Sequence, residues 1–127
     1  ASADALVQVL EMPHYKRIRT VVVSSTGAGS SRIIVGGGLG KLISFHLRHL
    51  LADHTGQENA FHSLRSRTTI VRATSLTDDQ AAGRLVYFQD REKSPTIKTD
   101  RADLAIWIVG EVCDRAKHVG SRVVNVT

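Results

Sequence analysis

Alternation of apolar and polar residues dominates the middle of the chain, from Lys41 to Leu51. At a period of two, one side holds Ile43, Phe45 and Leu47 and the other holds Ser44, His46 and Arg48. A β-strand places alternate side chains on opposite faces of a sheet, so this segment predicts a strand with one apolar and one basic face. Many of the same positions also fit a helical stripe with Leu39, Leu42, Leu50 and Leu51, so a helix over 39–53 is the competing interpretation.

Further segments are predicted as strands by alternation or by their β-branched residues. They are residues 5–11, 17–25, 32–35, 60–73 and 84–90. The first two are separated by a short break at Pro13, so they are predicted to form an N-terminal hairpin. Residues 26–31 and 36–40 have the glycine and serine content of turns. The sequence therefore predicts an antiparallel sheet made of this hairpin and about four further strands.

The segment 101–119 predicts a helix. Leu104, Ile108 and Val112 recur at helical spacing, Asp100 or Asp103 caps the start, and a glycine follows the end. A strand at 105–109 is the rival interpretation, and residues 121–127 are predicted as either strand or coil. The predicted fold class is α+β, an antiparallel β-sheet followed by a C-terminal helix, in a single domain spanning 1–127. Since one helix covers only part of such a sheet, dimerisation is expected to complete the core.

Composition adds one positive indication and several exclusions. The net charge of +5 favours a polyanionic partner such as nucleic acid, although it is also compatible with a basic protein that has none. No apolar run is long enough for a membrane span, and the first residues lack the layout of a signal peptide and are interpreted as a chain without its initiator Met. The single cysteine, Cys113, excludes an intramolecular disulfide and is expected to be a small buried side chain.

The glycine-rich turn from Gly36 to Gly40 looks like a phosphate-binding turn that follows the β-branched residues before it. Val35 occupies the leading glycine position of a P-loop, and Leu42 replaces its hydroxyl residue. Lys41 occupies the third glycine position of the dinucleotide fingerprint. Both motifs fail, which favours a flexible turn between strands. A small α/β nucleotide-binding domain that uses this turn remains the alternative function.

No metal, cofactor or enzymatic activity is predicted. The histidines are scattered, and the closest pair, His46 and His49, has no acidic residue that completes a metal motif. Asp78 and Asp79 lie in a predicted loop, and no residue is predicted to be positioned as their acid or base partner. The serines at 24, 25, 30 and 31 lie in no nucleophile elbow.

Basic and polar side chains of three predicted neighbouring strands form the candidate binding face. It comprises Ser44, His46, Arg48, Ser63, Arg65, Arg67, Thr69, Tyr87 and Gln89. Guanidinium groups bind phosphates, hydroxyl groups meet base edges, and an aromatic ring stacks on a base, as single-stranded or looped RNA requires. An ordinary solvated sheet face is the alternative.

The order of these predicted elements resembles that of the coat proteins of small single-stranded RNA bacteriophages. The likeness lies in the N-terminal hairpin, the short strand at 32–35, the long strands around 42–48 and 64–72, the loop 74–83, the strand 84–90 and the terminal helix. It rests on element order and not on a short motif. The β-branched segment 123–126 departs from the family, which usually has further helix there.

The resemblance implies a homodimer that assembles into an icosahedral shell and binds genomic RNA, usually with one RNA hairpin through which it represses translation. It places Ser44, His46 and Arg48 on the hairpin-binding strand, Arg65, Arg67 and Thr69 on the next strand, and Tyr87 as the stacking aromatic. The loop 74–83 would lie between dimers. The expected localisation is the virion, assembled in the bacterial host cytoplasm. A β-rich RNA-binding or partner-binding module that forms no shell is a third interpretation.

Overall fold

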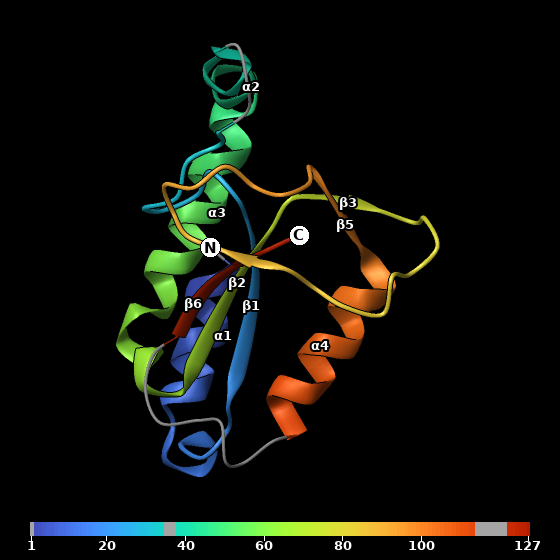
Figure 1. The fold of residues 1–127 in the computed structure, drawn as a ribbon. Coiled ribbons are helices and arrows are strands. Elements are labelled where there is room, and N and C mark those ends of the chain that lie inside the picture. The colour runs from blue at the N-terminus through green and yellow to red at the C-terminus, as the bar shows by residue number, and fades with distance from the viewer. Residues whose placement is uncertain (1, 35–37, 114–121) are drawn as a thin grey trace.

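The structure is a computed structural model that describes residues 2–34, 38–113 and 122–127. A sheet runs through the centre, with helices on both sides of it (Figure 1). The elements in chain order are α1 (Ser2–Glu11), η1 (Pro13–Tyr15), β1 (Thr20–Ser25), α2 (Leu39–His46), α3 (Arg48–Ala60), η3 (Phe61–Arg67), β2 (Thr68–Ala73), β3 (Ser75–Thr77), β4 (Tyr87–Phe88), β5 (Lys98–Asp100), α4 (Arg101–Cys113) and β6 (Arg122–Val126).

The central sheet has the strand order β1-β2-β6-β4. β1, β2 and β6 are parallel, with Val22 opposite Ile70 and Ile70 opposite Val123, whereas β4 runs antiparallel to β6. Parallel neighbours require crossover connections, which contain α2 and α3 between β1 and β2 and α4 between β2 and β6. β3 and β5 pair in a separate small parallel sheet. This alternation of parallel strands and helices is an α/β architecture.

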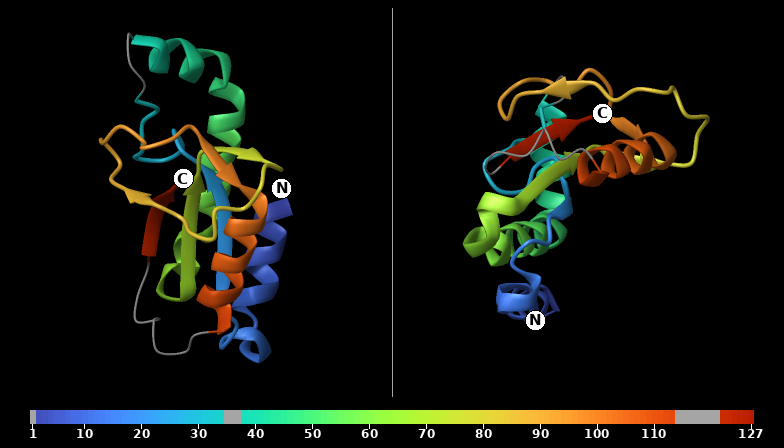
Figure 2. Two further views of the ribbon diagram at one scale, coloured as in Figure 1. Left: turned by 45° about the vertical axis from the view of Figure 1, so that its right-hand side comes forward. Right: turned by 90° about the horizontal axis from the view of Figure 1, so that it is seen from below.

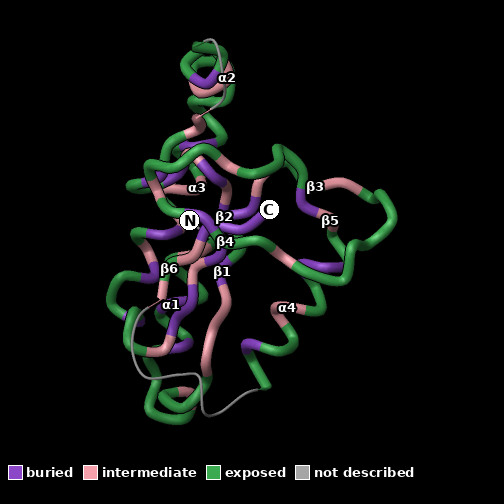
Figure 3. Tube along the Cα trace, viewed as in Figure 1, coloured by how far each residue is buried: buried purple, intermediate pink, exposed green. Residues whose placement is uncertain are grey.

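Helices lie against opposite faces of the sheet (Figure 2), and an apolar cluster holds them on each face. The first joins β1 to α1 and η3 and comprises Val7, Leu10, Val22, Phe61 and Leu64. The second joins β2 and β6 to α4 and comprises Val71, Ala73, Leu104 and Val126. Burial along β2 is nearly continuous for this reason (Figure 3), which is typical of a parallel strand covered on both faces.

The N-terminal segment forms helix α1, so the strand predicted at 5–11 and the predicted hairpin are wrong. Ala3, Val7 and Leu10 recur at helical spacing, and Val7 and Leu10 are buried. Leu6 and Val9 are exposed, so neither side of the predicted strand is buried as a whole. The strand predicted at 17–25 is confirmed for β1.

Residues 41–51 are helical, so the strand predicted there is also wrong. α2 ends at His46 and α3 begins at Arg48, which agrees with the competing interpretation of a helix over 39–53. Phe45 is 63% exposed and Leu47 is 38% exposed, so the expected apolar sheet face is largely at the surface. The residues that α3 buries are Leu51 and Glu58, seven positions apart on one side of the helix.

The remaining predicted elements are confirmed only in part. Of 60–73, the first half is the 3-10 helix η3 and only the second half is strand β2. Residues 32–34 form no strand, and residue 35 lies outside the described residues. Of 84–90, only Tyr87–Phe88 is strand.

The helix predicted at 101–119 is confirmed for Arg101–Cys113, which excludes the rival strand at 105–109. Residues 114–119 of that prediction lie outside the described residues. Cys113 is exposed and not buried as expected. Within 121–127, Arg122–Val126 forms β6, an interior strand of the sheet.

The predicted α+β fold class, an antiparallel sheet that a dimer partner completes, is therefore wrong. Helices of the same chain cover both faces of the sheet, and its three longest strands are parallel. Among the helices that the structure describes, none has the length and apolar character to cross a membrane.

Candidate functional site

A buried ion pair between Arg72 of β2 and Glu58 of α3 lies at the carboxyl-end half of the sheet. Their side chains are only 4% and 7% exposed. Nε of Arg72 donates to Oε1 of Glu58 at 2.9 Å, and Nη2 donates to Oε2 at 2.7 Å. Two parallel hydrogen bonds of this kind fix the geometry of the pair as well as its charge.

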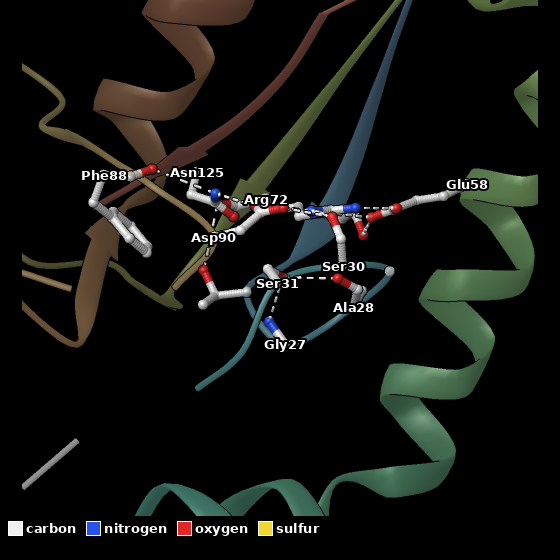
Figure 4. A network of polar contacts seen from close by, with 12 residues as sticks. Gly27, Ala28, Ser30, Ser31, Glu58, Arg72, Phe88, Asp90 and Asn125 are labelled. Carbon is white, nitrogen blue, oxygen red and sulfur yellow. Dashed lines mark hydrogen bonds and ion pairs between the residues drawn. The ribbon is translucent and has the colours of Figure 1, made fainter. Parts of the chain in front are cut away.

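The outer side of the Arg72 guanidinium meets Ser30 and Asp90. Nη1 of Arg72 donates to Oγ of Ser30 at 3.1 Å and to Oδ1 of Asp90 at 3.2 Å. Oγ of Ser30 in turn donates to Oδ2 of Asp90 at 2.5 Å. These contacts bring the loop after β1 and the loop after β4 onto one side chain (Figure 4).

Ser24 and Asn125 connect the network to the strands on either side of β2. Oγ of Ser24 on β1 donates to Oε1 of Glu58 at 2.6 Å. Nδ2 of Asn125 on β6 donates to Oδ1 of Asp90 at 2.8 Å. The network therefore joins β1, β2, β6, α3 and two loops through polar side chains that are mostly buried.

The loop after β1, residues 26–31, packs directly on the ion pair. Gly29 has a φ of +56°, and a Cβ there would lie 2.2 Å from Nη2 of Arg72 and 2.6 Å from Oε2 of Glu58. The N–H of Gly29 donates to Oγ1 of Thr55 at 3.0 Å. A glycine is required at this position by both the backbone conformation and the close approach. The shape of the loop is thus set by contacts with the interior.

The contacts of the network hold Arg72 and Asp90 in their ionised forms. Burial alone lowers the pKa of Arg72, but the hydrogen bonds and charge of Glu58, with those of Asp90, outweigh burial and raise that pKa. The hydrogen bond from Ser30 lowers the pKa of Asp90, and Asn125 and Arg72 act in the same direction against burial. Arg72 therefore stays cationic and Asp90 stays anionic at neutral pH.

A pocket of about 580 Å³ opens beside the network at the carboxyl ends of β1 and β2. Its polar lining includes Ser25, Thr26, Arg32, His54 and Thr74. Its apolar walls include Ile33, Ile34, Leu39, Ile43, Leu47, Leu50, Leu76, Phe88 and Ile97. In open parallel α/β sheets, ligands bind in the crevice outside the carboxyl ends of the strands, which is where this pocket lies.

The residues predicted as a binding face do not lie on three neighbouring strands. Ser44 and His46 lie on α2, Arg48 on α3, Ser63, Arg65 and Arg67 on η3, Thr69 on β2, Tyr87 on β4, and Gln89 just after β4. The prediction assumed three neighbouring strands, whereas most of these residues are helical.

Several of these side chains have local structural contacts instead. Oγ of Ser44 donates to the Gly40 carbonyl at 2.8 Å within α2. The guanidinium of Arg48 lies over the Phe45 ring, 4.6 Å from its centroid. Arg67 donates to three backbone carbonyls near the end of α1 and around η1.

The sequence-based site prediction missed Glu58, Arg72, Asp90 and Asn125. One signal was present, because Arg72 interrupts the β-branched run of 68–73 and a buried arginine needs a buried counter-charge. No signal in the sequence identifies Glu58 as that counter-charge. In the part of the chain that the structure describes, no group of three His, Cys, Asp or Glu side chains could hold a metal ion.

Comparisons with known proteins agree with the α/β fold. A family model described as NAD(P)H-binding matches residues 1–114. The chuY protein of E. coli CFT073 has a similar structure, with a TM-score of 0.74 and 19% identity over 98% of this chain and 63% of that chain. A putative NAD-dependent epimerase/dehydratase from Bacillus halodurans gives a TM-score of 0.70 and 22% identity over 98% of this chain and 51% of that chain.

A short-chain dehydrogenase/reductase from Veillonella parvula, solved in complex with NADP, gives a TM-score of 0.57 and 18% identity over 98% of this chain and 56% of that chain. The chain thus spans between 51% and 63% of the length of these three structures. No curated protein matches the sequence.

These matches overturn the resemblance to bacteriophage coat proteins and what it implied. The predicted shell, the RNA partner, the virion localisation and the non-enzymatic role are all corrected by them. The resemblance failed because it aligned predicted strands at 5–11 and 41–52 that are helices. The alternative of an α/β nucleotide-binding domain agrees better with the findings.

Proposed function

The chain belongs to the NAD(P)H-binding family, and on this basis we propose that it forms the substrate-side part of an NAD(P)-dependent oxidoreductase. In this proposal, the pocket at the carboxyl ends of β1 and β2 receives the substrate and the nicotinamide end of the cofactor. The observation that carries the proposal is the position of this pocket relative to the parallel strands. The dehydrogenase and epimerase/dehydratase names of the structural relatives support this class of chemistry.

The lining of the pocket suits a substrate that has an apolar body and one polar reacting group. Apolar side chains from α2, α3 and the segments around β3 and β4 form most of the wall, which suits an apolar substrate body. The hydroxyls of Ser25 and Thr74 and the imidazole of His54 are among the lining groups that could hydrogen-bond a substrate oxygen. His54 is half-buried on α3, one turn before Glu58, and an imidazole can give or accept a proton.

The ion-pair network gives the pocket a fixed rim. The N–H of Thr26 donates to the Ala73 carbonyl at 2.9 Å, which joins the carboxyl ends of β1 and β2. Gly29 and Ser30 anchor the rest of the loop on Arg72. A binding site that is held by packed and hydrogen-bonded supporting residues keeps its polar groups in place.

The pyrophosphate of NAD(P) does not fit among the described residues. Dinucleotide folds hold it on a glycine-rich turn whose backbone N–H groups face the ligand at the start of a helix. Here Gly29 faces Arg72 and Glu58, and its N–H is bonded to Thr55. Gly38 is open to solvent at the start of α2, but Gly36 and Gly37 lie outside the described residues. Among the described residues, the pocket therefore accounts for the substrate side and not for the phosphates.

NMR titration of the isotopically labelled chain tests the proposed pocket. Reduced nicotinamide mononucleotide should shift the amide signals of Ser25, Thr26 and Thr74, whereas adenosine monophosphate should not. Leu47→Arg, which places a long charged side chain in the pocket wall, should weaken binding about tenfold or more. Val112→Arg is the control, since Val112 is similarly exposed (44% against 38%) on α4. Shifts that avoid these three amides, or equal effects of both variants, would refute the proposal.

A further inference from the structure

Helix α2 stands away from the rest of the chain, beyond the carboxyl ends of the strands (Figure 1 and Figure 2). On one side of the helix, Leu39 and Ile43 line the pocket at the carboxyl ends of β1 and β2. Leu42 and Phe45 lie outside that lining, and they are 58% and 63% exposed. Three positions apart in one helix, these two residues are neighbours on its outer side. A surface helix normally turns polar residues outward, so this apolar pair indicates a binding surface.

Basic side chains accompany the apolar pair. Lys41 lies one turn before Phe45 on the same side of α2, and the Arg48 guanidinium lies 4.6 Å from the centroid of the Phe45 ring. His46 and His49 are exposed in the same segment. Among the described residues, no carboxylate forms an ion pair with Lys41 or Arg48. Exposed cationic groups next to exposed apolar side chains suit a partner that is both anionic and apolar.

The distribution of charge along the sequence favours the same kind of partner. Residues 12–52 contain no Asp or Glu, and they contain six Lys and Arg residues. The rest of the chain has eleven Lys and Arg against twelve Asp and Glu, a net charge of −1, so residues 12–52 supply the whole excess of +5. Lys41 and Arg48 are the two of these six residues that lie on α2 and in the first turn of α3. An anionic partner at α2 thus meets no carboxylate from this segment.

We propose that the outer side of α2 is a docking surface for a lipid bilayer that carries anionic headgroups. Leu42 and Phe45 enter the boundary between headgroups and acyl chains, and Lys41 and Arg48 contact the anionic headgroups. The strength of such binding scales with the buried apolar area and with electrostatic attraction to anionic lipid. α2 (Leu39–His46) is too short to cross a bilayer, so it lies in the plane of the membrane surface. Because the other side of the same helix lines the pocket, docking places the pocket close to the lipid.

A second copy of this chain fits the outer side of α2 less well than an anionic membrane. Two copies related by a two-fold axis would place the same surface of each against the other. Lys41 and Arg48 of one copy would then lie close to those of its partner, and like charges that meet across an interface oppose binding. Since residues 12–52 contain no Asp or Glu, this segment provides no carboxylate to offset the repulsion.

Co-sedimentation of the purified chain with lipid vesicles tests the docking surface. Vesicles of phosphatidylcholine that contain about 30% phosphatidylglycerol should bind the chain at least about tenfold more tightly than vesicles of phosphatidylcholine alone. Added salt should weaken this binding, because it screens exposed charges. Phe45→Glu should weaken the binding about tenfold or more, because a carboxylate replaces a side chain that enters the bilayer. Leu42→Glu should cause the same loss, and it keeps the test decisive if Phe45→Glu does not fold.

Two matched controls accompany these variants. Ile106→Glu places the same carboxylate on α4, where Ile106 is 68% exposed, and it should leave vesicle binding unchanged. Lys41→Gln together with Arg48→Gln should weaken binding about tenfold or more, since each basic residue near an anionic membrane contributes about fivefold. Arg65→Gln together with Arg84→Gln removes the same net charge at two exposed positions outside α2 and α3, and it should change binding by less than about threefold.

Several results would overturn the proposal. Binding that is equal with and without phosphatidylglycerol, or that is absent from both kinds of vesicle, would show that no anionic membrane docks on this chain. Equal losses for Phe45→Glu and Ile106→Glu, or for the two double variants, would show that binding does not use α2. A lipid-free dimer that Phe45→Glu converts to a monomer in analytical ultracentrifugation would identify a contact between copies instead. Vesicle binding needs no substrate or cofactor, so these outcomes do not depend on the proposed function.

Discussion

Gly29 and Arg72 approach so closely that a Cβ at Gly29 would lie 2.2 Å from Nη2 of the arginine. The contact joins a loop at the rim of the pocket to a buried cation. The position of the rim therefore depends on the interior of the protein. Substitutions at this contact can separate the contribution of backbone conformation from that of packing.

Gly29→Ala should lower the free energy of unfolding by about 2–4 kcal/mol, because left-handed strain and overpacking against Arg72 add together. Gly83→Ala is the matched control, since Gly83 has a φ of +78° with no heavy atom within 4 Å of a built Cβ. That variant should lose only about 1 kcal/mol. Urea denaturation measures both values. Equal losses would show that packing on Arg72 does not restrict position 29.

Arg72→Met should cost about 3–5 kcal/mol of stability, because it leaves the Glu58 carboxylate buried without its cation. Adding Glu58→Leu should cost less than the sum of the two single changes, since the double variant leaves no unpaired charge. Arg101→Met is the control, because its ion pair with Asp78 is exposed (53% and 82%). It should change stability by less than about 1 kcal/mol. Additive losses at positions 58 and 72 would contradict a coupled pair.

The lowered pKa of Asp90 predicts a loss of stability in acid. An unfolded aspartate titrates near pH ~3.9, so the unfolded chain takes up a proton at this residue before the folded protein does. The stabilisation from Asp90 is thus fully present above about pH 5 and is lost as the pH falls through the folded pKa. Urea denaturation across this range should show a weaker pH dependence for Asp90→Asn. The exposed control Asp78→Asn should keep the full dependence, and an unchanged slope for Asp90→Asn would contradict the assignment.

Trp107 and Tyr87 provide a spectroscopic test of the packing of α4 on β4. Nε1 of Trp107 donates to Oη of Tyr87 at 2.5 Å, and Trp107 is the only tryptophan in the chain. Tyr87→Phe should shift the fluorescence emission of Trp107 and lower the free energy of unfolding by about 1 kcal/mol or less. Tyr15→Phe, on η1, should leave the emission unchanged. Identical spectra for Tyr87→Phe and the parent protein would argue against this hydrogen bond.

Some elements could be predicted because their local signals agreed with their environment. Helix 101–113 combines helical spacing of Leu104 and Ile108 with an acidic start, and β1 contains a run of valines. By contrast, residues 41–51 fit both periods equally well. The choice between a strand and a helix depends on which positions the rest of the fold covers. Phe45 and Leu47, which a strand would have buried, are exposed. The error there, together with α1, changed the predicted fold class.

The site was less predictable than the fold. Arg72 and Glu58 are 14 positions apart, and their pairing requires α3 to lie across β2. Asp90 and Asn125 join them only because β6 is inserted between β2 and β4. Side chains that are brought together by neighbouring parallel strands have no characteristic spacing in the sequence. Metal-binding and P-loop motifs do have such a spacing and can therefore be found in it. The pocket likewise draws its lining from several separate stretches of the chain.

The insertion of β6 also has a consequence for how the protein folds. β1 and β2 with their intervening helices can pair while the final strand is still free, but Asp90 gains its contact with Asn125 only when that strand enters the sheet. Contacts of long sequence separation form slowly because a large loop must close first. The loop at 26–31 should therefore reach its native rigidity in the last kinetic phase. A folding intermediate would have most of its helices in place and an unformed pocket.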